Sequence, residues 1–85
     1  MKLYNQQKLE KFFANNFETP LFPVLANLYN EKKEYKRAQK VCKIGLSHNP
    51  NNYVGQFILA KTYLANKQYI AAEKILKTVV AHDTH

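Results

Sequence analysis

Apolar side chains recur three or four residues apart along most of the chain, as they do on one face of an α-helix. The clearest group is Phe22, Leu25, Ala26 and Tyr29. A polar run at residues 30–33 ends this helix, and a second apolar face begins near residue 34. The members of that second face are Tyr35, Ala38, Cys42, Gly45 and Leu46. The pattern therefore predicts an all-α protein built from antiparallel helix pairs.

The ends of these helices carry recognisable signals. Thr19 is expected to be the N-cap of the first helix, with Pro20 at its first position, where a missing N–H costs nothing. Pro50 is expected to end the second helix, because proline disfavours a helical residue before it and cannot continue the hydrogen-bond ladder.

The same pattern returns after 34 residues, which makes the chain an internal repeat. The matching pairs are Leu25 and Leu59, Ala26 and Ala60, Tyr29 and Tyr63, Tyr35 and Tyr69, Ala38 and Ala72, and His48 and His82. We expect one domain of about five helices: an N-terminal capping helix within residues 1–18, a first repeat at 19–52 and a second at 53–85. The small residues Ala26, Ala38, Ala60 and Ala72 are expected at close helix crossings.

The repeated positions resemble the motif W-x2-L-G-x2-Y, A-x3-F, P of the tetratricopeptide repeat family. The first repeat supplies Phe22, Leu25, Ala26, Tyr29, Ala38, Cys42 and Pro50, and the second supplies Gln56, Leu59, Ala60, Tyr63, Ala72 and Leu76. The run TPLFPVLANLY followed by VCKIGLSHNP is similar to repeats of bacterial members. The chain departs from the motif at Lys33 and Lys67, where a turn glycine is usual, at Gln56 in the tryptophan position, and at Thr84 in place of the closing proline.

The resemblance implies a right-handed solenoid whose first helices line a concave face that binds a peptide or helix of a partner protein. The chain is thus expected to be an interaction module or scaffold and not an enzyme. The positions that map onto the concave face are Pro23, Asn27, Asn30, Val54, Phe57, Lys61 and Leu64.

Candidate chemistry changes this expectation little. His48 and His82 occupy equivalent repeat ends, which indicates an incidental role near helix C-termini, and no Cys/His cluster has metal-ligand spacing. Cys42 is the only cysteine and falls at an apolar motif position, so it is expected to be buried. No cofactor or metal site is expected. A single cysteine and the lack of a signal or membrane-spanning segment predict a cytoplasmic protein.

The formal net charge of +7 leaves one alternative open. Lys36, Lys40 and Lys43 share one helix face and are able to meet nucleic acid or an acidic surface. The plainer interpretation is a solvated outer face. Nucleic acid is the less favoured partner, because the tyrosines fall at core motif positions and Arg37 is the only arginine. A further alternative is that the chain is the N-terminal structural piece of a longer solenoid.

The last helix is not patterned as a solvent-facing cap. Tyr69, Leu76, Val79 and Val80 are expected to face a neighbour that the sequence does not contain. Four such side chains would leave roughly a few hundred Å² of contiguous apolar surface exposed, which is the scale that marks an interaction site. The sequence therefore predicts self-association, in the commonest case as a symmetric homodimer through the C-terminal helix.

Overall fold

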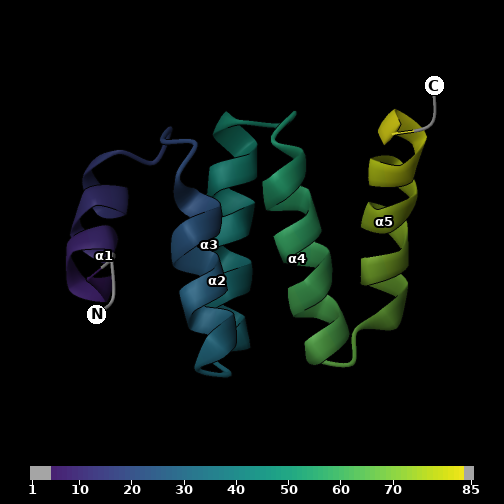
Figure 1. Cartoon of the computed structure of the whole chain (residues 1–85), viewed down its shortest axis with the longest axis horizontal. Helices are drawn as coiled ribbons and strands as arrows, with labels where there is room; N and C mark the ends of the chain where they lie inside the picture. Colours follow the sequence, from purple (N-terminus) through teal and green to yellow (C-terminus); the bar gives the residue numbers. More distant parts are fainter. Residues whose placement is uncertain (1–4, 84–85) are drawn as a thin grey trace.

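The computed structural model describes residues 5–83, which form five α-helices and no strand. They are α1 (Gln6–Asn15), α2 (Phe22–Glu31), α3 (Tyr35–His48), α4 (Tyr53–Ala65) and α5 (Tyr69–Asp83). The helices run up and down in a row from α1 at one end to α5 at the other (Figure 1). In this row α2 packs against α1, α3 and α4, while α5 packs only against α4 among the described helices. The all-α fold expected from the sequence is confirmed.

The beginning of α2 differs from the expectation. The helix starts at Phe22, and Thr19 is not its N-cap. A helix capped by Thr19 would draw its first hydrogen bond from the N–H of residue 23 to the Thr19 carbonyl, and Pro23 has no N–H to give. The Thr19 hydroxyl instead accepts from the Leu21 N–H at 3.1 Å, which forms a tight turn before the helix.

The two turns inside the helix pairs have the same backbone conformation and the same hydrogen bonds. Lys33 and Lys67 both have φ of 62°, the left-handed conformation that favours glycine. After each lysine, a backbone N–H returns to a carbonyl five residues earlier: Glu34 to Tyr29 at 2.9 Å and Gln68 to Tyr63 at 2.8 Å. These bonds define the same helix ending twice, 34 residues apart. The lysines therefore adopt the conformation of the glycine that they replace.

The core is organised around the ring of Phe22, which is 1% exposed. A Cβ atom added to Gly45 on α3 would lie 2.2 Å from this ring, and one added to Gly55 on α4 would lie 2.3 Å from it. Both helices thus approach the ring this closely only because they carry glycine there. The four expected crossing alanines have no exposed surface: Ala26, Ala38, Ala60 and Ala72.

The N-terminal helix covers the open side of α2. Its cap is Asn5, whose side chain accepts from the Lys8 N–H at 3.2 Å. Phe13 is buried in the shared core, and Glu10 accepts a hydrogen bond from the Tyr29 hydroxyl. The first repeat is therefore covered on both sides, by α1 and by α4.

Candidate interaction surfaces

Helix α4 carries apolar residues on two opposite faces. Its core face buries Leu59 and Tyr63. On the other side lies the α4 stripe, which we define as Val54, Phe57, Lys61 and Leu64. The apolar members of the stripe are 64%, 53% and 45% exposed in the order Val54, Phe57 and Leu64. A helix of a soluble protein ordinarily turns charged and polar side chains to solvent, so this second apolar face indicates a surface that binds something.

Helix α2 packs against α4 and carries two asparagine side chains, one of which contacts α4. Asn27 and Asn30 are half-buried, and the Thr62 hydroxyl lies 2.9 Å from Asn30 Oδ1 and 2.8 Å from the Ile58 carbonyl oxygen. Among the described residues, Asn27 Oδ1 and Asn30 Nδ2 are covered but have no hydrogen-bond partner. Pro23 is buried and offers little surface to a partner.

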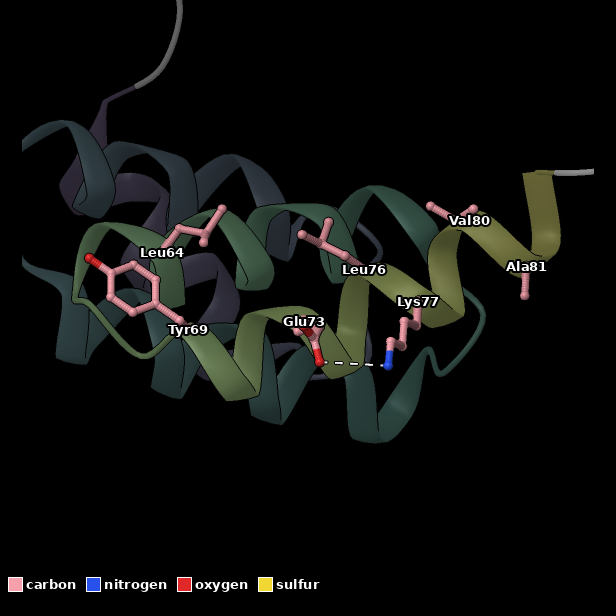
Figure 2. Close-up of a pocket in the computed structure, with 7 residues that line it drawn as sticks. All are labelled: Leu64, Tyr69, Glu73, Leu76, Lys77, Val80 and Ala81. Carbon is pink, nitrogen blue, oxygen red and sulfur yellow. Dashed lines mark ion pairs between the residues drawn. The ribbon is translucent and has the colours of Figure 1, made fainter.

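A second surface lies at the end of the row. An open groove of about 610 Å³ runs along α5, with one wall from the C-terminal turn of α4 (Figure 2). We call it the α5 groove, and its lining residues are Leu64, Tyr69, Glu73, Leu76, Lys77, Val80 and Ala81. Leu64 belongs to both surfaces, so the α4 stripe and the α5 groove meet at this residue.

The α5 groove contains three of the four residues expected from the sequence to face a neighbour. Tyr69, Leu76 and Val80 line it, whereas Val79 is half-buried and is not part of the lining. The groove also holds Glu73 and Lys77, which sequence reasoning did not single out and which pair at 3.6 Å. The helical spacing i, i+4, i+7, i+8 and i+11 from Tyr69 would have found both, and would have placed Val79 on another side of the helix.

The buried titratable groups serve the core. Burial raises the pKa of the Cys42 thiol to about 12, so the thiol stays protonated and unreactive at neutral pH. Burial and the hydrogen bond to Glu10 raise the pKa of Tyr29 to about 12, against the opposing charge of Arg37. The Arg37 guanidinium also lies 5.9 Å from the centre of the Tyr29 ring and 3.1 Å from Glu34. These contacts fix α1, α2 and α3 to one another.

Neither metal nor membrane chemistry is indicated by residues 5–83. Among the side chains that the structure describes, at residues 5–81, no group of three or more from His, Cys, Asp or Glu is placed to hold a metal ion. None of the described helices combines the length and the hydropathy that a membrane span requires. On the outer surface of α3, Lys36, Lys40 and Lys43 are all exposed.

The chain gives no significant match to a curated protein or to a solved structure. A family model described as tetratricopeptide repeat matches residues 29–85. The matched region runs from the last turn of α2 through both lysine turns and includes the two helices that form the α5 groove. Repeats of this family generally mediate protein–protein interaction. Together with the 34-residue register of the helices, the match shows that the chain belongs to the tetratricopeptide repeat family.

Proposed function

We propose that this protein is an interaction module that binds a peptide or helix of a partner protein against the α4 stripe and the neighbouring asparagines of α2. The observation that carries the proposal is the second apolar face of α4, with Val54, Phe57 and Leu64 exposed on the side away from the core. Exposure of such a face to water is unfavourable. Burial against a partner's apolar side chains would stabilise the complex by roughly 25 cal/mol per Å² of apolar surface removed from water.

The polar groups beside the stripe specify the kind of segment. Lys61 lies in the middle of the stripe and is exposed, so it favours an acidic side chain between apolar anchors. Asn27 and Asn30 hold a covered acceptor and a covered donor without partners in the described structure, and rotation of these amides would present them to the main chain of an extended peptide. The expected partner segment is therefore apolar with an acidic residue, and the chain's charge of +7 steers such a segment toward it.

A matched pair of phenylalanines tests the proposal. Phe57 on the α4 stripe and Phe12 on α1 are 53% and 45% exposed, so each is replaceable without opening the core. A photo-crosslinking residue placed at position 57 should capture a partner from the source cells, and the same residue at position 12 should not. Phe57→Lys should then abolish co-purification of the identified partner, while Phe12→Lys leaves it intact. Equal loss from both variants, or capture from position 12 alone, would show that the α4 stripe is not the binding surface.

The lysine face of α3 is the alternative site, since its side chains are exposed and it carries positive charge. Binding of nucleic acid or an acidic surface there requires Lys36, Lys40 and Lys43 and weakens steeply with salt. Replacing all three by glutamine separates the two functions. Loss of the partner in this variant, with Phe57→Lys still binding, would move the site from α4 to α3.

A further inference from the structure

The repeat itself shows what kind of element the α5 groove accepts. Shifted back by 34 residues, Leu64, Leu76 and Val80 of the groove correspond to Asn30, Cys42 and Leu46 of the first repeat. There the equivalent surface is covered by α4, which packs against both α2 and α3. Cys42 has no exposed surface and the Thr62 hydroxyl of α4 meets Asn30. The α5 groove is thus the same helix-binding surface one repeat later, without a helix from residues 5–83 on it.

We propose that the helix that occupies this groove is α5 of a second copy of the chain, in a two-fold symmetric dimer. In such a pair each copy presents the same surface, so a residue that contacts a second residue is also contacted by it in return. The surface must therefore be complementary to itself. This condition is strict, and the sequence of α5 meets it for an antiparallel arrangement.

The complementarity is centred on the level of Ile75. In antiparallel helices related by a two-fold axis at that level, positions equally far before and after Ile75 face each other. Glu73 and Lys77 lie two residues to either side, so each Glu73 meets Lys77 of the second copy, and two ion pairs form. Tyr69 and Ala81 lie six residues to either side, so the largest groove side chain faces the smallest.

The centre of the pair is apolar. Leu76 lies one residue, or about 1.5 Å, past the axis level, so the two copies of Leu76 are offset by only about 3 Å along the helix and lie within reach of each other. Val80 extends the apolar surface toward the end of the helix. The acid and the base that now pair with each other inside one copy, at 3.6 Å, are 69% and 76% exposed at their side chains. Exchanging these partners between copies therefore requires no buried charge to be uncovered.

The dimer is expected to be weak. Helix α5 has 15 residues and is thus about 22 Å long, which is too short to bury the ~800 Å² per partner of a standard stable complex. Two copies of charge +7 also repel each other. Association should therefore depend on concentration, and the monomer should dominate at low micromolar concentration.

Charge exchange at residues 73 and 77 tests the proposal. Sedimentation equilibrium from low to high micromolar concentration should show a reversible monomer–dimer equilibrium for the natural sequence. Glu73→Lys alone and Lys77→Glu alone each face like charges across the axis, so each should dimerise roughly tenfold more weakly. Mixed in equal amounts, the two variants should form a heterodimer at least about tenfold more favourable than either homodimer, because both ion pairs are restored. The double variant E73K/K77E should regain self-association.

Two controls make the result decisive. Lys74→Glu changes the net charge as much as Lys77→Glu does but lies outside the groove lining, and it should not reproduce the loss. Circular dichroism of every variant should retain the helical signal, since all three positions are exposed. A chain that stays monomeric at high micromolar concentration overturns the proposal. Self-association that shows no preference for the mixed pair, or that is lost only with Phe57→Lys, overturns it as well, because the contact would then lie elsewhere.

Discussion

The two helix pairs have the same plan but different surroundings. The pair α2 and α3 lies between α1 and α4, whereas the pair α4 and α5 has described neighbours on one side only. Cys42 on α3 has no exposed surface, whereas Leu76, the residue at the same position on α5, is only half-buried. The repeat motif sets the local geometry, and the next helix along the row decides which motif positions become core. The α5 groove is a direct consequence of this difference.

A second difference lies at the tryptophan position of the motif. In the first repeat Phe22 fills it and is enclosed between α3 and α4, because Gly45 and Gly55 allow both helices to approach. In the second repeat Gln56 occupies it and its side-chain amide donates to the Pro50 carbonyl at 2.8 Å. The first repeat is thus held by apolar packing at this point and the second by a local hydrogen bond.

Replacing these two residues by alanine should give the largest contrast in stability. Phe22→Ala removes a fully buried ring and should cost about 3–5 kcal/mol of unfolding free energy, enough to unfold a chain of this size. Gln56→Ala should cost about 0.5–1.5 kcal/mol, the contribution of one hydrogen bond. Urea unfolding followed by circular dichroism measures both. Similar losses from the two variants would mean that the ring of Phe22 is not the centre of the core.

Thiol reactivity probes the coverage of α3 and α5 at equivalent positions. Cys42 should react on the order of 100-fold more slowly than a cysteine placed at Leu76 in a Cys42→Ala background, because burial raises the pKa of Cys42 to about 12 and blocks access. The rates are compared with a chromogenic disulfide at neutral pH and low micromolar concentration. Urea should abolish the difference, which confirms that it arises from the fold. Fast modification of Cys42 without urea would show that α4 does not cover α3.

Substituting the glycines beside Phe22 should change the unfolding free energy by a smaller amount. An alanine in place of glycine ordinarily stabilises a helix by roughly 1 kcal/mol. Here Gly45→Ala and Gly55→Ala should instead destabilise by about 1–3 kcal/mol, because the new methyl would lie within 2.5 Å of the ring. The same glycine substitutions should cost less in a Phe22→Leu background, which removes part of the clashing ring. Additive losses in that double-mutant cycle would place the strain elsewhere.

Particular residues show how far the sequence predicts this fold. The helix spacing and the 34-residue shift anticipate the row of helices, and the shift from Tyr35 to Tyr69 recurs as the first residues of α3 and α5. The prediction that Thr19 is the N-cap is wrong, because Pro23 has no N–H to donate to the Thr19 carbonyl four residues earlier. A cap signal alone does not register this missing donor.

Contacts between distant residues were beyond the reach of periodicity. The packing of Gly55 against Phe22 joins helices from different repeats, and the hydrogen bond from Tyr29 to Glu10 joins a motif position to the N-terminal helix. The residues of the exposed stripe were named from the family resemblance, and three of the four residues named for the last apolar face line the α5 groove. Their use by a partner or a second copy stays a prediction.

The smallest effect is expected at the turn lysines, where the two repeats are most alike. Lys33 and Lys67 share φ of 62°, a conformation that costs roughly 1–2 kcal/mol for a residue with a Cβ atom. Glycine adopts it without strain but loses more backbone entropy on folding. Lys33→Gly and Lys67→Gly should therefore each raise the unfolding free energy by about 0.5–1 kcal/mol, measured by urea unfolding.

Lys32→Gly is the matched control, because this neighbouring exposed lysine has φ of −93° and gains nothing from glycine. Because the two turns have the same hydrogen bonds, their gains should be equal within error and should add in the double variant. A gain at Lys33 without one at Lys67 would show that the second turn is less well formed than the first.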